Sequence, residues 1–167
     1  MKIRVLGAAR EVGRSAFQIN CDGTNFLLDY GVMFGKPRGT PPTYPLHVKP
    51  RDIDSVIITH AHLDHSGCVP SLFVSGNCNV FATAPTFDLS KLLIKDMIKI
   101  EKNSHSFGLP EIENMMQKAK IIELKQKIRR GNATFELRSS GHVVGGSAIL
   151  LESENKRLFY TGDINLR

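Results

Sequence analysis

The sequence lacks the features of a membrane protein. No apolar run is long enough to span a bilayer, and the apolar residues 3–6 end at Gly7, shortly before charged residues. A stretch this short is not a secretory signal. We therefore expect a cytoplasmic protein without a membrane segment.

Cysteine is also scarce. Cys21, Cys68 and Cys78 are odd in number and show no C-x-x-C spacing, which indicates reduced thiols rather than a disulfide framework. Cys68 lies close to a group of histidines in the sequence. We expect it to be a small buried apolar residue rather than a metal ligand.

Internal repeats, low-complexity segments and a linker between domains are absent. The 167 residues, of which 41% are hydrophobic and 23% charged, suffice for one domain, so residues 1–167 are interpreted as a single domain. The proline-rich stretch 36–50 is expected to form a surface loop near the functional site.

Acidic residues are the minority among the charged ones. The chain has 16 Asp and Glu against 22 Lys and Arg, a net charge of +6. A basic excess favours polyanionic partners, nucleic acid first, although a solvated surface is the ordinary alternative. Aromatic residues are sparse in the most basic stretch, so it favours contacts with phosphates over stacking on bases. Its basic residues are Lys118, Lys120, Lys125, Lys127, Arg129 and Arg130.

Strands dominate the expected secondary structure, with helices inserted between them. The β-branched run Ser55–Thr59 predicts a strand buried on both faces. A helix is expected at Pro85–Glu101, with one apolar stripe formed by Leu89, Leu92, Leu93, Met97 and Ile100. Other helices are expected at 66–74 and 110–118, and strands at 3–6, 15–20, 26–29, 79–83, 121–124, 134–138, 148–151 and 157–160. This order predicts an α/β fold in which helices cover a sheet.

The run His60-Ala61-His62-Leu63-Asp64-His65 is a dense group of potential metal ligands. Side chains alternate along extended backbone, so His60 and His62 are expected to point the same way and to hold one metal ion. Asp64 and His65 follow where the chain turns into a helix, and they can face a second position. Imidazole and carboxylate ligands suit zinc, and also iron or manganese.

Three further residues at expected strand ends complete this pattern. His142 offers a third histidine to the first metal, and Asp163 offers a carboxylate that could bridge both. Asp29 would orient a ligand histidine or a metal-bound water. Taken singly, each would be an ordinary turn or loop residue, so these assignments depend on the histidine run. His47 and His105 are assigned no role.

Taken in order, these motifs resemble the metallo-β-lactamase superfamily. In detail they resemble its β-CASP nucleases, which include the archaeal and eukaryotic cleavage and polyadenylation specificity factor-like nucleases and ribonuclease J. The resemblance covers essentially the whole chain. It rests on H-A-H-L-D-H, G-H and T-G-D, and in detail on Gly7–Ser15, Leu28–Gly31, His65–Gly67 and Thr161–Arg167.

The resemblance implies an αββα sandwich that holds two zinc ions and hydrolyses RNA. The ligands it implies are His60, His62 and His142 for one ion, Asp64 and His65 for the other, and Asp163 as the bridge. The candidate catalytic residues are Asp64, which could accept a proton from the attacking water, and Asp29.

The resemblance also implies parts that are not in this sequence. The chain ends four residues after Asp163, about where the family's β-CASP domain begins. Another zinc-ligand histidine, a catalytic histidine and much of the RNA groove follow later in the family, so two zinc ions are expected in the complete site, of which this chain could hold one alone. We therefore interpret the chain as the N-terminal half of the sandwich, either a fragment of a longer protein or a separate subunit. A sheet left uncovered would expose a large apolar face, so we expect a second polypeptide or another copy of this chain as partner.

One local departure from the family pattern concerns His142. The segment Val143–Ala148 carries one residue more than is usual before Ser-Ala. The extra residue would either shift His142 or lengthen its turn.

Three functions are open at this point. The first is a metal-dependent ribonuclease, or half of one. The second is a metallo-β-lactamase-fold hydrolase of thioesters or small phosphodiesters, against which the basic charge counts. The third is a non-catalytic RNA-binding or scaffolding subunit, against which the intact ligand set counts.

Overall fold

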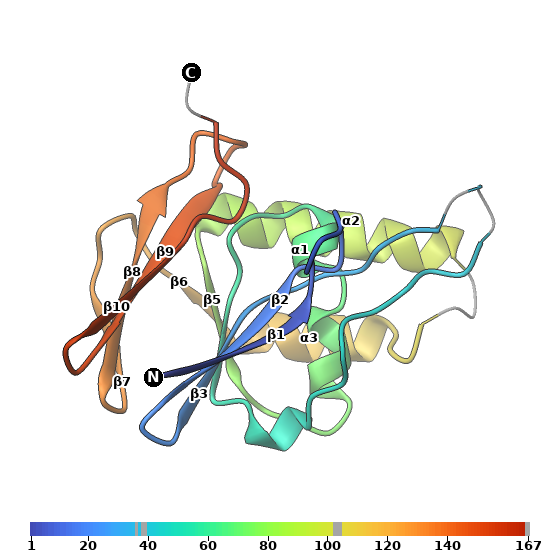
Figure 1. Ribbon diagram of the computed structural model, residues 1–167. Helices are drawn as coiled ribbons and strands as arrows, with labels where there is room; N and C mark the ends of the chain where they lie inside the picture. The colour runs from blue at the N-terminus through green and yellow to red at the C-terminus, as the bar shows by residue number, and fades with distance from the viewer. Residues whose placement is uncertain (36, 38–39, 102–104, 166–167) are drawn as a thin grey trace.

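A helical layer, a mixed sheet and an antiparallel sheet stack in that order (Figure 1). The computed structural model describes residues 1–35, 37, 40–101 and 105–165. Parts of the expected loop 36–50 and of the motif Thr161–Arg167 lie outside these residues. The predicted α/β class, with helices covering a sheet, is confirmed.

Two sheets form within the described residues. The mixed sheet runs in the order β1 (Lys2–Gly7), β2 (Ala16–Cys21), β3 (Thr24–Tyr30), β4 (Ser55–Ile57), β5 (Asn79–Ala82) and β6 (Ala119–Ile121). Its first three strands pair antiparallel, and β3 to β6 pair parallel. The antiparallel sheet runs in the order β10 (Lys156–Tyr160), β9 (Ser147–Ser153), β8 (Ala133–Ser139) and β7 (Ile128–Arg130).

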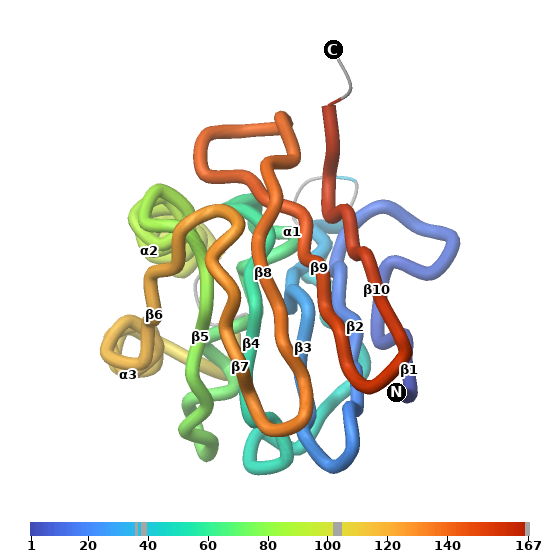
Figure 2. The backbone as a smooth tube through the Cα atoms, turned by 90° about the vertical axis from the view of Figure 1, so that its left-hand side faces the viewer, coloured from blue at the N-terminus to red at the C-terminus, as the bar shows by residue number. Residues whose placement is uncertain are grey.

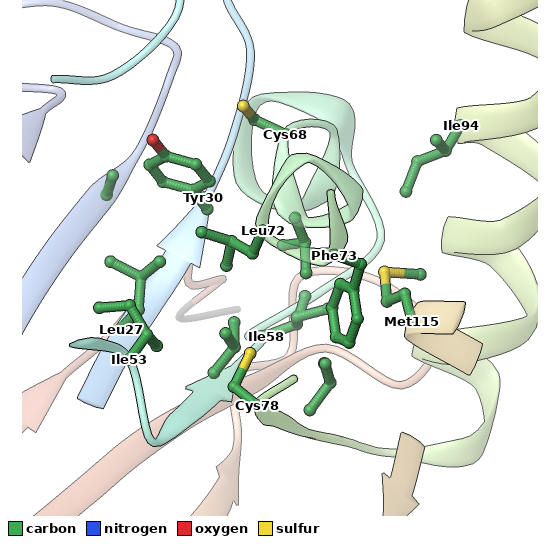
Figure 3. Packing of buried hydrophobic residues seen from close by; sticks show 14 of the residues in the cluster. Leu27, Tyr30, Ile53, Ile58, Cys68, Leu72, Phe73, Cys78, Ile94 and Met115 are labelled. Carbon is green, nitrogen blue, oxygen red and sulfur yellow. The ribbon is translucent and has the colours of Figure 1, made fainter. Parts of the chain in front are cut away.

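The helical layer covers the outer face of the mixed sheet. It contains α1 (Leu63–Ser66), α2 (Ala84–Ile100), α3 (Leu109–Gln117) and the 3-10 helices η1 (Pro50–Asp52) and η2 (Val69–Phe73). Figure 3 shows how side chains of this layer, such as Leu72 and Ile94, pack together with Leu27 of β3.

The central strand β4 is buried on both faces, as predicted. Val56 packs toward the helices and Ile57 toward the antiparallel sheet, because successive side chains of a strand point to opposite faces. Between the sheets, the ring of Phe135 meets those of Phe26 and Phe81, with centroids 6.0 and 5.1 Å apart. The mixed sheet is therefore enclosed from two sides, which fixes the strand ends that carry the candidate ligands.

The predicted apolar stripe of α2 was wrong except for Met97, which is buried. The helix buries Phe87, Ser90, Ile94 and Met97, which follow the i, i+3, i+7 pattern of one face. Of the predicted stripe, Leu89, Leu92 and Ile100 are 39%, 65% and 64% exposed. The helix is apolar over more than one face, so the pattern alone did not determine which face packs on the sheet.

The short edge elements also departed from expectation. β7 was not predicted, β6 lies earlier than the expected 121–124, and the expected helix 66–74 is replaced by α1 and η2. Edge strands are short and charged, so they lack the alternation that marks a strand with a buried face.

The outer face of the antiparallel sheet is covered by no helix or strand among the described residues (Figure 2). It carries Phe159, which is 56% exposed, and Leu150, its cross-strand neighbour. Two ion pairs share the face: the guanidinium of Arg138 with Glu136 at 2.7 Å, and that of Arg157 with Glu152 at 2.6 Å. The face is therefore less apolar than we expected of an uncovered sheet. In the described part of the chain, no helix has the length and apolar character needed to cross a membrane.

Candidate metal centre

Four segments meet at one end of the sandwich. Asp29 lies near the end of β3, residues 60–65 follow β4, His142 lies in the loop between β8 and β9, and Asp163 follows β10. Because β3 and β4 are parallel neighbours, their carboxyl ends reach the same edge of the sheet. The β8–β9 loop and the end of β10 lie near α1, at the upper end of the tube in Figure 2.

The first group of ligand atoms comes from His60, His62, His142 and Asp163, and these atoms all lie within 4.8 Å of one another. His62 Nδ1 is 3.0 Å from His60 Nε2 and 3.3 Å from His142 Nε2. A carboxylate oxygen, Asp163 Oδ2, lies 3.5 Å from His142 Nε2. Three imidazole nitrogens and one carboxylate oxygen are therefore gathered as a cation would require.

The protonation of His60 suits a ligand. The Thr59 hydroxyl donates to Asp29 Oδ2 at 2.8 Å, so it can accept the Nδ1 proton of His60, 3.0 Å away. This arrangement leaves Nε2 of His60 with a free lone pair directed at the other ligands. Burial lowers the pKa of His60 to about 4, so the ring is neutral at pH 7.

A second group lies on the other side of Asp163. Nε2 of His65 is 3.4 Å from Asp163 Oδ1 and 3.9 Å from Asp64 Oδ2. The other oxygen of Asp163 faces the first group, at 4.0 Å from Nε2 of His60. Asp163 thus stands between the two groups, and its side chain is 47% exposed.

Asp29 is fully buried and touches no solvent. It accepts hydrogen bonds from the backbone nitrogen of Thr59 at 2.7 Å, from Nδ1 of His65 at 2.7 Å and from the hydroxyl of Tyr160 at 2.9 Å. Burial lowers the pKa of His65, but the carboxylates of Asp29, Asp64 and Asp163, with Asp29 first among them, together raise it above its usual value. Asp29 reaches the site through these neighbours, and its orienting role stays a prediction.

Thr59 and Tyr160 were missed as members of the centre. Thr59 is the last residue of the predicted strand before His60. Tyr160 lies two residues after the inward-facing Leu158 on β10, so the two side chains share the inner face. Each signal places the side chain inside the fold. Neither signal identifies a buried carboxylate as the partner.

Two glycines allow the segments to approach each other. A Cβ on Gly31 would lie 1.7 Å from the backbone oxygen of Asp64, where β3 leaves the sheet beside α1. Gly162 has a φ of 53°, and its Cβ would lie 2.9 Å from the side chain of Thr59. Both positions require glycine for the ligand-bearing segments to come together.

The additional residue after His142 lengthens the turn. Gly146 closes the turn by donating to the Val143 carbonyl at 2.8 Å, and the Gly145 carbonyl accepts from Thr83 Oγ1 at 2.8 Å. His142 still reaches the first group. The position of His142 therefore favours the lengthened turn over a displaced histidine.

Residues assigned no metal role lie outside the group of ligand atoms. Cys68 is buried in the helical-layer core with its Sγ 3.4 Å from Ser71 Oγ, as expected, and Cys21 and Cys78 are also buried free thiols. His47 is exposed, and Nδ1 of His105 lies 2.8 Å from the Tyr44 hydroxyl.

The basic stretch lies on β6, β7 and their connection. Lys120, Lys125, Lys127 and Arg129 are exposed, and the guanidinium of Arg130 lies 5.1 Å from the centre of the Phe81 ring. Contact with phosphates stays a prediction for these residues.

Comparison with known families and proteins gives consistent matches. Residues 18–167 match the family described as a metallo-beta-lactamase superfamily domain. The chain is 38% identical over 173 residues to the probable RNase MJ4 of Methanocaldococcus jannaschii and 33% identical over 168 residues to ribonuclease TTHA0252 of Thermus thermophilus. It is 32% identical over 163 residues to cleavage and polyadenylation specificity factor subunit 3-I of Arabidopsis thaliana. These alignments cover 100%, 100% and 95% of the chain but 40%, 38% and 24% of the relatives, so it spans less than half their length.

Solved structures share the fold at low sequence identity. A protein of unknown function from Enterococcus faecalis superposes with a TM-score of 0.71 at 18% identity, over 98% of this chain and 43% of that one. A metallo-β-lactamase from Cronobacter sakazakii gives a TM-score of 0.60 at 15% identity, over 89% and 57% of the two chains. The predicted half of a sandwich is consistent with these partial coverages.

Replacing His62 tests the first group of ligand atoms. His62→Asn removes the ring whose Nδ1 lies near the ring nitrogens of both other histidines. Losing a residue that hydrogen-bonds a metal ligand typically lowers metal affinity roughly 10–100-fold, so losing a ligand itself should lower the affinity for Zn²⁺ by more. Isothermal titration of the metal-free protein with Zn²⁺ measures this. His47→Asn is the matched control and should bind as the unchanged protein does. Equal affinity in the two variants would contradict the site.

Proposed function

Because the chain belongs to the metallo-β-lactamase superfamily, we propose that it provides the metal-binding half of a β-CASP-type ribonuclease that hydrolyses RNA phosphodiester bonds. The observation that carries the proposal is the position of Asp163. One of its oxygens faces His60 and His142, and the other faces His65. A carboxylate placed in this way can bridge two cations, which is the arrangement of two-metal hydrolases.

The donor set supports zinc. His60, His62 and His142 would hold one ion, Asp64 and His65 the other, and Asp163 would contact both. Imidazole nitrogens combined with carboxylates are zinc ligands, and a neutral His60 requires no loss of a proton before binding. When bound, such ions supply Lewis acidity that lowers the pKa of a water and offsets the charge of a phosphate.

The protein's own groups perform the remaining steps. Asp64 is one-third exposed at the site, so its carboxylate can accept a proton from an attacking water. Thr59 and Asp29 hold the protons of His60 and His65 on Nδ1, which keeps the Nε2 lone pairs directed at the site. Asp29 acts through these contacts, so we assign it a positioning role.

The proposed substrate agrees with the charge of the surface. The exposed basic residues on β6, β7 and their connection can contact the phosphates of a single strand without base readout. The relatives of the chain include proteins named ribonucleases. We propose RNA as the substrate of this chain because of those names. The basic balance counts against a hydrolase of thioesters or small phosphodiesters.

The proposed partner covers the outer face of the antiparallel sheet. In Figure 2 this face is open across the described elements, and β10 and β1 lie at the same side of the two sheets. The relatives are more than twice as long as the chain. A second polypeptide segment, or a second copy of this chain, would bury Phe159 and pair with the free edge of β10.

Asp64→Asn tests the proposed chemistry. The change removes a proton acceptor and a ligand while keeping the size of the side chain, so RNA cleavage by the protein with its partner should fall at least about 100-fold. A gel assay with labelled RNA and Zn²⁺ measures the rate. Asp22→Asn is the control, because this exposed hairpin residue has a φ of 47° that asparagine also adopts. Cleavage that survives Asp64→Asn would contradict the assignment, and RNA binding without any cleavage in the unchanged protein would favour a scaffolding subunit.

Replacing Lys125 and Lys127 together by alanine tests the basic surface. For each phosphate that a lysine no longer neutralises, the slope of log affinity against log salt should become shallower by about 0.7 for a single strand. Fluorescence anisotropy with single-stranded RNA at several salt concentrations measures the slope. Alanine at Lys91 and Lys95, which pair with Glu113 at 3.2 and 2.8 Å, removes the same charge elsewhere. An equal effect of the two double variants would show that only net charge matters.

Sedimentation equilibrium tests the partner. A homodimer would have twice the 18.5 kDa mass of the chain. Phe159→Ser should weaken the dimer, because it removes the exposed ring that the dimer would bury. A monomer that gains RNA cleavage only when the remaining polypeptide is added would support the second segment instead. A monomer that cleaves RNA at full rate by itself would contradict the need for any partner.

A further inference from the structure

Tyr160 brings a hydroxyl from the antiparallel sheet to the buried carboxylate of the mixed sheet. It is the last residue of β10, and its ring packs between the sheets against Phe17 with centroids 5.1 Å apart. The hydroxyl lies 2.9 Å from Asp29 Oδ2. The two residues are 131 positions apart in the sequence, so this contact exists only once both sheets have assembled.

The direction of the hydrogen bond is fixed by the chemistry of both groups. A carboxylate can only accept, so the phenol donates. Burial and the nearby Asp29 carboxylate raise the pKa of Tyr160 above its usual value, so the phenol keeps its proton. Thr59 Oγ1 and His65 Nδ1 also donate to Asp29 Oδ2, at 2.8 and 2.7 Å. Three donors at one oxygen leave the carboxylate a single orientation.

That orientation decides which nitrogen of His65 carries the proton. In the neutral ring, Nδ1 donates to Asp29, so Nε2 is the unprotonated nitrogen, and it faces Asp163 Oδ1 at 3.4 Å. Asp163 follows Tyr160 by three residues on the same segment. Tyr160 therefore donates a hydrogen bond to Asp29, the residue that orients His65, and it lies three residues before Asp163 in the sequence.

We propose that Tyr160 is a positioning residue for the second metal position, where it fixes the tautomer of His65 through Asp29. The inference rests on the two-metal site of the proposed function but not on RNA as the substrate. A purely structural tyrosine would stabilise the sheet contact without any effect on His65.

Tyr160→Phe tests the proposal, because it removes the hydroxyl and keeps the ring against Phe17. In the metal-free protein, at a pH above the raised pKa of His65 where the ring is neutral, the ring nitrogen shifts of His65 in ¹⁵N NMR should change from one tautomer to a mixture. We expect the second position, with Asp64 and His65, to be the weaker of the two. Titration with Zn²⁺ alone should give an affinity about 10–100-fold lower at this second position and an unchanged affinity at the first. Tyr30→Phe is the matched control, since it removes a hydroxyl of β3 that lies 3.5 Å from the Leu46 carbonyl, and it should leave His65 and both affinities unchanged.

Several outcomes would overturn the proposal. A single His65 tautomer in Tyr160→Phe would do so, as would equal weakening of both Zn²⁺ positions. If the variant does not fold, the unchanged protein still provides a test: a nuclear Overhauser effect should join the hydroxyl proton of Tyr160 and the Nδ1 proton of His65, and its absence would overturn the proposal. None of these readouts uses RNA, so a protein that never cleaves RNA would refute the proposed function and leave this inference to be decided by His65.

Discussion

The carboxylate of Asp29 is the interaction on which the metal centre depends. It is removed from water, and such a charge is tolerated only when hydrogen bonds replace its hydration. The donors come from Thr59 after β4, from His65 on α1 and from Tyr160 on β10. Every segment that reaches this carboxylate also carries a candidate ligand, directly or within a few residues. The cost of burying one acid is thus offset by the contacts that organise the site.

Much of the fold could be predicted from the sequence because burial imposes strong patterns. The run Ser55–Thr59 has three β-branched apolar residues in succession, and the strand that it forms lies between two cores. The ligand run His60–His65 was recognisable because so many donors rarely occur together by chance. Its position after a buried strand indicated a rigid support. These features are local, and each is complete within a few residues.

The parts that were missed depend on contacts between distant segments. The apolar residues of α2 surround more than one face of the helix, and only packing into the core between the helices and the mixed sheet selects Phe87 and Ile94. β7 is a short edge strand whose charged residues hide its pairing with β8. Tyr160 has the pattern of an ordinary strand residue, since the sequence of β10 does not indicate that Asp29 of the other sheet is its partner. Long-range partners of this kind are what a local pattern cannot contain.

The gathering of His62 and His142 has a consequence for the connectivity of the chain. Their ring nitrogens are 3.3 Å apart although 80 residues separate them in the sequence, and the cysteines of the chain are free thiols. A cation held by both would close a loop of that length, as a covalent cross-link does in a secreted protein. Unlike a disulfide, a cation that binds only the folded state does not restrict the unfolded chain, so it stabilises the fold by mass action. In a chain without disulfides, the metal centre would then serve as the cross-link between the first sheet and the second.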